Sequence, residues 1–151
     1  MFHRYRHEST IYPSLSRIPL HVRMKLDVTG IKISLKDWLA FNIEERKVVC
    51  HLPVETADER EVFSSYLNFL SQRHCGTPAA TTPALSTCAW ESTHQVPGPV
   101  ASKSTPEIPP VTIDEWRRWK SHQRYALYKT ALSQSEREQF CAVLEEFREL
   151  K

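Results

Sequence analysis

The amino-acid sequence predicts an all-α fold, a small helical domain with an internal duplication in which a Pro-rich linker joins two similar helical halves. Three observations support this prediction. Helix start signals recur along the chain, apolar residues follow them at helical spacing, and the residues around Trp38 recur around Trp116, 78 residues later. A chain of 151 residues, 40% of them hydrophobic, is long enough to bury one core.

The first element is expected to be a helix between Pro19 and Gly30. Apolar and polar residues alternate there, which by period alone would favour a strand. Proline, however, is common at the first position of a helix, and glycine is common just past its end. Apolar residues also recur at an interval of four, at Ile18, Val22 and Leu26. We therefore expect a helix, followed by a short extended stretch over Ile31–Ile33.

Later helices are marked by a side chain that can cap the first turn and by an acidic residue three positions on. Such pairs are Ser34 with Asp37, Asn42 with Glu45, Thr56 with Glu59, Thr112 with Glu115, and Ser133 with Glu136. They predict short helices over residues 35–40 and 113–119, and further helices after the other caps. A helix of one turn is not stable alone, so tertiary packing must hold the short ones.

The second half of the chain repeats the pattern of the first. Ile33–Trp38 aligns with Val111–Trp116, and Arg46 aligns with Arg124 at the same offset. After one slip of a single residue, the match continues through the helices that follow. We interpret this as an internal duplication. Chance similarity between amphipathic helices is the alternative.

Four residues of the repeated pattern are expected to serve the structure. Helical spacing places Trp38 and Trp116 in the core. Arg46 and Arg124 are expected to form ion pairs or to cover an aromatic ring, and binding of a ligand by these arginines is the alternative.

The prolines indicate how the chain is divided. We expect a basic N-terminal segment over residues 1–17, a first helical half over 18–74, a Pro/Thr/Ser-rich linker over 75–110 and a second half over 111–151, together forming one domain. Seven of the ten prolines fall between Pro78 and Pro110, so neither a helix nor a strand ladder is expected there. Trp90 is expected to pin this linker to the folded body.

Composition and motifs exclude several classes of protein. No apolar run approaches the ~18 residues that cross a bilayer, and no apolar segment follows the basic N-terminus, so we expect a cytoplasmic protein without a secretory signal. Only three glycines occur and no Gly-rich phosphate-binding motif is present. The net charge of +2 argues against a dedicated nucleic-acid binder. No catalytic motif occurs, so we expect neither an enzyme nor a bound cofactor.

Two alternatives remain open. A small metal site could form around His74, Cys75 and His94, although their spacing matches no common zinc pattern. A nucleic-acid or anion-binding module could use Arg23, Lys25 and the basic and aromatic residues of the 116–129 stripe. Helical spacing offers a simpler interpretation of this stripe, in which the aromatic rings enter the core and the basic residues face solvent.

The run from Ile18 to Ile33, followed by Ser34–Trp38, resembles the nitrate-reductase-associated protein family of cyanobacteria and related phototrophs. Further matches are Arg46, Gly76–Pro78, Val111–Trp116 and Arg124–Leu127, and the resemblance extends from about Ser14 to Phe147. It implies a non-enzymatic accessory protein whose partner is assimilatory nitrate reductase. The implied mechanism is protein binding that assists maturation, cofactor loading or electron delivery.

The contact with this partner is expected on the first helix. Residues 1–34 hold six Lys and Arg against two Asp and Glu, so this quarter of the chain is the most basic. Within it, Arg23, Lys25 and Asp27 form a charged set that packing alone does not require. We expect Arg23 and Lys25 to meet an acidic patch on the reductase, and Asp27 to pair with Arg23 one helical turn away.

Overall fold

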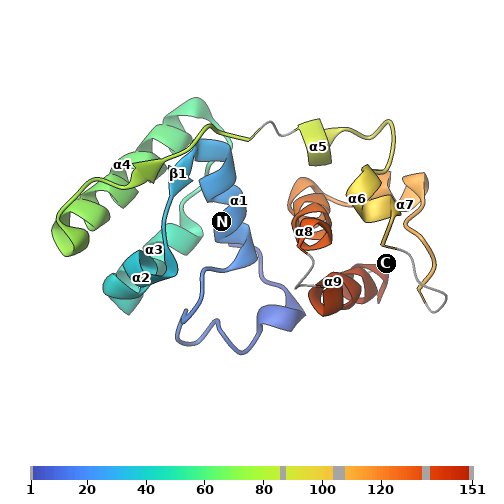
Figure 1. Cartoon of the computed structure of the whole chain (residues 1–151), viewed down its shortest axis with the longest axis horizontal. Helices are drawn as coiled ribbons and strands as arrows, with labels where there is room; N and C mark the ends of the chain where they lie inside the picture. Colours follow the sequence, from blue (N-terminus) through green and yellow to red (C-terminus); the bar gives the residue numbers. More distant parts are fainter. Residues whose placement is uncertain (1, 86–87, 104–107, 134–136, 150–151) are drawn as a thin grey trace. The chain divides into compact units, whose positions relative to one another are not determined.

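The computed structural model describes residues 2–85, 88–103, 108–133 and 137–149, in which helices dominate and the all-α prediction is confirmed (Figure 1). The chain forms two compact units. Unit 1 comprises residues 1–4 and 8–85, and unit 2 comprises residues 5–7 and 86–151. The boundary between residues 85 and 86 falls inside the segment that the sequence predicts to be a linker. A short 3-10 helix, Arg6–Glu8, lies near the N-terminus.

In its described residues, unit 1 consists of four α-helices and one pair of short strands. The helices are α1 (Leu20–Thr29), α2 (Leu35–Ala40), α3 (Ile43–His51) and α4 (Ala57–Cys75). The strands β1 (Ile31–Lys32) and β2 (Ala80–Thr81) pair antiparallel, with Ile31 opposite Thr81. The long helix α4 packs against α2 and α3 (Figure 1). The core between them includes Trp38, Phe41, Phe63 and Leu67, each at most 1% exposed.

The expected helix after Ile18 is confirmed as α1, with one difference at its start. Pro19 is the N-cap residue and precedes the helix, and Leu20 is its first residue. Gly30 ends α1 in the left-handed conformation with φ of 73°, and its N–H donates to the carbonyl of Leu26. The chain then continues directly into β1, so the expected extended stretch is confirmed over its first two residues.

Helix caps predicted from the sequence hold four helices. Asn42, Thr56 and Thr112 each form a reciprocal capping box with the Glu three residues later. Ser34 accepts a hydrogen bond from the N–H of Asp37 at the start of α2. The pair Ser133 and Glu136 lies partly outside the described residues. Each cap satisfies a first-turn N–H that has no partner within its helix.

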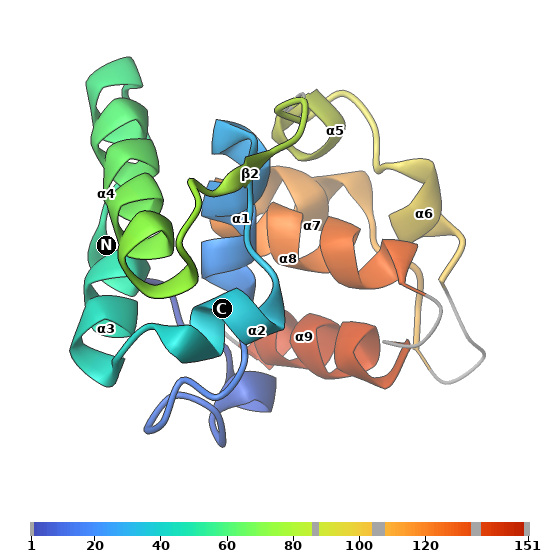
Figure 2. The same ribbon diagram turned by 60° about the vertical axis from the view of Figure 1, so that its left-hand side comes forward.

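Unit 2 consists of five helices in its described part. They are α5 (Cys88–Glu91), α6 (Gly98–Ala101), α7 (Ile113–Arg118), α8 (Ser121–Leu132) and α9 (Arg137–Glu149). Helices α8 and α9 lie side by side in both views (Figures 1 and 2). Buried rings of Trp90, Trp116, Tyr125 and Phe140 fill the core of this unit.

The expectation that residues 78–110 contain neither helix nor strand is wrong. Strand β2 and the one-turn helices α5 and α6 lie in this range. Their stability comes from packing, because α5 and α6 both contact α8 and carry the buried side chains of Trp90 and Val100. The ring of Trp90 meets that of Tyr125 edge-on, with centroids 5.0 Å apart. The expected anchoring of this segment by Trp90 is therefore confirmed.

The two halves share one local arrangement. Helices α2 and α7 have six residues each, and in both cases two residues separate the short helix from the next one. Trp38 and Trp116 occupy the same position in the two helices and are 1% and 0% exposed, so the expected burial of both is confirmed. The duplication of the entire halves stays a prediction.

Candidate functional site

The three charged residues predicted to form one set on α1, Arg23, Lys25 and Asp27, do not share the same exposure in the structure. Arg23 and Asp27 are half-buried, whereas Lys25 is 1% exposed. The Nζ of Lys25 donates a hydrogen bond of 2.6 Å to the carbonyl of Cys50. The expectation that Lys25 presents its charge to a partner is therefore wrong. Lys25 lies one helical turn after Val22 and shares its inward face, which the alternating sequence conceals.

The surroundings of Lys25 do not include a thiolate. Burial lowers the pKa of Lys25 to about 8 and raises the pKa of the Cys50 thiol to about 12. Cys50 is thus neutral at physiological pH, and the ammonium is held by its carbonyl. That carbonyl belongs to the last turn of α3, where carbonyls have no partner within the helix.

Arg46, like Lys25, donates hydrogen bonds to carbonyls at the end of a helix, in this case α2. Its guanidinium donates to the carbonyls of Trp38, Leu39 and Ser14 at 3.1, 2.9 and 3.1 Å. Two of these carbonyls end α2, where a cation also interacts favourably with the helix dipole. These hydrogen bonds of Arg46 differ from the expected ion pair or aromatic contact, because carbonyls at the end of a six-residue helix lie within its reach.

Arg124 repeats this arrangement in unit 2. It donates to the carbonyl of Trp119, the residue that follows α7, at 2.5 Å, and to the carbonyl of Trp90 at 2.7 Å. Its Nη2 also lies 3.8 Å from a carboxylate oxygen of Glu91, so here an ion pair accompanies the carbonyl contacts. These contacts give Arg124 the structural role that the sequence predicts.

The structure does not support the two alternative sites, the nucleic-acid stripe over residues 116–129 and the metal site around His74, Cys75 and His94. The rings of Trp116, Trp119 and Tyr125 are buried, so their faces are not available for stacking on bases. Nε2 of His74 lies 2.8 Å from Glu45 on α3, whereas His94 belongs to unit 2. Within the described residues, no group of three or more His, Cys, Asp and Glu is placed to hold a metal ion.

Unit 2 contains a pocket of about 670 Å³ where α7, α8 and the last turn of α9 meet. We call it the unit 2 pocket. Two aromatic rings line it, Trp119 and Phe147, whose centroids lie 5.9 Å apart. The polar side chains that line it in the described structure are Glu115, Arg118, Lys120, Gln123 and Arg148. A cavity of this size falls within the range of small-ligand sites.

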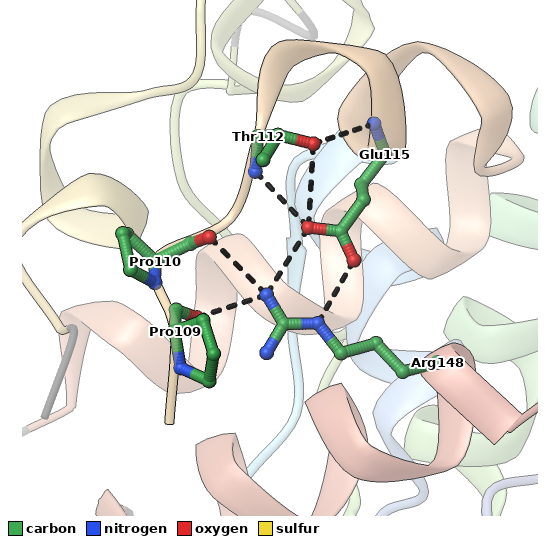
Figure 3. Close-up of polar contacts among 5 residues, drawn as sticks. All are labelled: Pro109, Pro110, Thr112, Glu115 and Arg148. Carbon is green, nitrogen blue, oxygen red and sulfur yellow. Dashed lines mark hydrogen bonds and ion pairs between the residues drawn. The ribbon is translucent and has the colours of Figure 1, made fainter. Parts of the chain in front are cut away.

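One wall of the unit 2 pocket is a fixed ion pair (Figure 3). Nε of Arg148 lies 2.8 Å from Glu115 Oε2, and Nη2 lies 3.1 Å from Oε1. The same Nη2 donates to the carbonyls of Pro109 and Pro110, while Glu115 Oε1 accepts from the N–H of Thr112. The hydrogen bond from Arg148 lowers the pKa of Glu115 below its ordinary value, so the carboxylate is ionised.

The rim of the unit 2 pocket carries two cations of a different kind. Arg118 and Lys120 are exposed, and neither their guanidinium nor their ammonium group has a partner among the residues that the structure describes. Both belong to the basic and aromatic stripe over residues 116–129. Phe147 and Arg148 could not be assigned to the same site from the sequence, because they lie 18 and 19 residues after the end of the stripe and reach the site only through the packing of α9 on α8.

Comparison with known proteins identifies one family. The family described as conserved nitrate reductase-associated protein matches residues 4–147. No curated protein and no solved structure matches the chain. Among the helices described here, none has the length and apolar character needed to cross a membrane.

Proposed function

Because the chain belongs to the family of conserved nitrate reductase-associated proteins, we propose that it is a non-enzymatic accessory protein that binds nitrate reductase and supports its activity. The observation that carries this proposal is the extent of the family match. Residues 4–147 include nearly all of both units, so the match extends over the sequence of both and is not limited to one motif.

The use of charged side chains in the fold is consistent with this proposal. Lys25, Arg46 and Arg124 all donate to main-chain carbonyls of this chain. Their charges therefore stabilise helix ends, and an accessory role requires only that the surface of the folded chain recognise a partner. The step that binding assists is proposed to be maturation, cofactor loading or electron delivery.

Co-purification and deletion in cells that grow on nitrate test the proposal. The tagged chain should bring down nitrate reductase, and deletion should lower reductase activity. If the deleted strain keeps full activity with an artificial electron donor and loses it with the natural donor, the assisted step is electron delivery. If both activities fall together with the cofactor content of the reductase, the assisted step is maturation or cofactor loading. Full reductase activity without the chain, and no co-purification, would refute the proposal.

We propose Arg23 and Asp27 on α1 as the contact for the partner, without Lys25, which is buried. The double variant Arg23→Asp, Asp27→Arg exchanges the two charges and keeps an opposite pair at the i, i+4 spacing. We expect its melting temperature to stay close to that of the native chain and its co-purification with the reductase to decrease. The double variant Lys32→Glu, Lys36→Glu, at exposed positions of the same unit, is the control. Native-like co-purification of the exchanged variant would exclude this contact.

A further inference from the structure

We propose that the unit 2 pocket binds an acidic segment of a protein partner, with its carboxylates on Arg118 and Lys120 and an apolar side chain against Trp119 and Phe147. This inference rests on the proposed function in one respect only, that the partner of the chain is a protein. It places a contact in unit 2, apart from the charged set on α1.

The charges that line the unit 2 pocket favour an anionic occupant. Three cations, Arg118, Lys120 and Arg148, stand against the carboxylate of Glu115. Glu115 is engaged by Arg148, so the charges of Arg118 and Lys120 are not compensated by described residues. Cationic side chains at a rim of this kind govern the approach and register of an oppositely charged partner.

The size and lining of the pocket favour a peptide over a lone inorganic anion. The volume of about 670 Å³ accommodates several side chains, and its aromatic part offers an apolar surface that a small anion would leave unused. An acidic segment with one apolar residue uses both parts, because its carboxylates reach the rim while its apolar side chain is removed from water.

The surroundings of the pocket disfavour nucleic acid. Trp119 and Phe147 are 8% and 3% exposed, so only a small part of each ring borders the pocket. An apolar side chain can contact that part, but neither ring presents a whole face on which a base could stack. Beyond the pocket, α9 carries the exposed carboxylates of Glu145 and Glu149, the second of which pairs with Arg6. A phosphate backbone that follows the surface would meet these charges, whereas a short acidic segment ends within the cationic rim.

Glu115 acts as a built-in competitor of the proposed ligand. Two main-chain carbonyls hold the guanidinium of Arg148 in place, and Glu115 neutralises it (Figure 3). An incoming carboxylate therefore competes with Glu115 for this cation. Removal of the charge of Glu115 makes a third cation available, and its replacement by Gln keeps an oxygen that can accept from Thr112 at the start of α7.

The test measures binding of a fluorescent peptide to the full chain. The peptide contains two Asp and two Glu residues around one Phe, and its counterpart carries Asn and Gln at the same positions. The native chain should bind the acidic peptide and not the amide peptide. The double variant Arg118→Glu, Lys120→Glu should bind it at least about tenfold more weakly, because attraction becomes repulsion at two positions. The double variant Lys32→Glu, Lys36→Glu has the same change in net charge and should keep the native affinity within about twofold.

The variant Glu115→Gln separates a binding role from a structural one. We expect it to bind the acidic peptide a few times more tightly than the native chain, provided that its circular dichroism spectrum shows a folded protein. A merely structural role of the Glu115–Arg148 pair predicts the same or weaker binding. An equal loss of binding in the Arg118/Lys120 and Lys32/Lys36 variants would show an effect of net charge alone and would overturn the proposal.

Competition experiments identify other occupants. The proposal is overturned if acetate or inorganic phosphate displaces the peptide at equal concentration, or if a single-stranded oligonucleotide binds more tightly than the peptide. It is also overturned if light scattering shows that the native chain self-associates through this pocket and the Arg118/Lys120 variant does not. Absence of peptide binding, with intact co-purification of the reductase, refutes the pocket and leaves the proposed function. Peptide binding in the expected pattern, without co-purification of the reductase, refutes the proposed function and leaves the pocket as a site for an acidic segment.

Discussion

Lys25 illustrates how single charged residues are used in this chain. Its ammonium leaves water and donates to a carbonyl of the last turn of α3. The contact satisfies a carbonyl that α3 itself cannot satisfy, but removal of the ammonium from water disfavours its charged form. The lowered pKa of about 8 expresses this balance.

The lowered pKa of Lys25 predicts a pH dependence of stability. Between the folded-state pKa of about 8 and the ordinary value of 10.5, the unfolded chain binds more protons than the folded chain. The free energy of unfolding should therefore rise with pH in this window, by up to about 1.4 kcal/mol per pH unit from this group. Below pH 8 the lysine is charged in both states, and the full penalty of burying the charge remains.

Urea denaturation of the native chain and of Lys25→Met at pH 7, 8, 9 and 10 measures this effect. Methionine fills similar space without a charge, and titrating groups that do not interact with Lys25 cancel in the difference between the two proteins. We expect the stability of the native chain relative to Lys25→Met to increase from pH 8 to pH 10. A difference that does not change with pH would contradict the burial of a charged Lys25.

The two core tryptophans give a second prediction for single residues. Trp38 and Trp116 are buried, and their Nε1 atoms donate to the carbonyls of Leu15 and Ser92. Replacement of either by Ala removes both the packing and the hydrogen bond, and should lower the free energy of unfolding by about 3–5 kcal/mol. Denaturant titration checks this, with Phe69→Ala as the control because Phe69 is 56% exposed. A small loss at Trp38 or Trp116, similar to that at Phe69, would argue against a core role.

The burial of a residue can be predicted from the sequence where it follows from a regular pattern. The positions of Trp38 and Trp116 after a capped helix start are such a pattern, and both are buried. Lys25 is different, because a charged residue on the inward face has no signal in the sequence that separates it from its exposed neighbours. The part of the unit 2 pocket that α7 and α8 contribute can likewise be recognised in the sequence as a basic stripe. The part that Phe147 and Arg148 contribute cannot, because it depends on how α9 packs.

Two glycines that end helices separate local conformation from packing. Gly30 follows α1 with φ of 73°, and Gly76 follows α4 with φ of 80°. A Cβ at Gly30 would lie 2.6 Å from the carbonyl oxygen of Thr82, whereas a Cβ at Gly76 would have no atom within 4 Å. Both positions therefore require the left-handed conformation, but only Gly30 also requires the absence of a side chain.

The variants Gly30→Ala and Gly76→Ala test this distinction. Gly76→Ala should lower the free energy of unfolding by about 1 kcal/mol, the usual effect of an L-residue in the left-handed region. Gly30→Ala should lower it substantially more, because the strand pair must shift to relieve the contact with Thr82. Denaturation of both variants under the same conditions provides the measurement. Equal losses would show that the chain around Thr82 yields without loss of stability.

The elements that the sequence predicts are those with local signals. Capping boxes identify the starts of α3, α4 and α7, since the interacting side chains lie within three residues of each other. Strand β2 and helix α6 carry no such signal. They form because β1 and α8 supply the partners, which are distant in the sequence. A Pro-rich composition therefore concealed short elements that tertiary contacts create.

For the whole molecule, the order of the chain differs from the division into units. Residues 5–7 belong to unit 2, although the rest of the first 85 residues belong to unit 1. A division of the chain at a single peptide bond would therefore leave one unit incomplete. The second copy of the predicted duplication would also be an incomplete unit, because a copy defined by sequence alignment omits residues 5–7, which belong to unit 2.

Tyr5 is the residue of this segment that we expect to stabilise unit 2. It is 3% exposed, its hydroxyl donates to the carbonyl of His122, and its ring centroid lies 6.1 Å from that of Phe147. Tyr5→Ala removes a buried ring and should lower the free energy of unfolding of unit 2 by about 3–5 kcal/mol. Tyr5→Phe removes only the hydroxyl and should have an effect of about 1 kcal/mol.

Hydrogen exchange locates the effect of Tyr5→Ala within the whole chain. We expect the amides of α8 and α9 to exchange faster than in the native protein, because local stability in unit 2 decreases. The fragment 86–151 should show the same fast exchange, since it lacks Tyr5, and the fragment joined to residues 1–7 through a flexible linker should recover protection. Unchanged exchange in α8 and α9 of Tyr5→Ala would show that unit 2 is complete without its N-terminal segment.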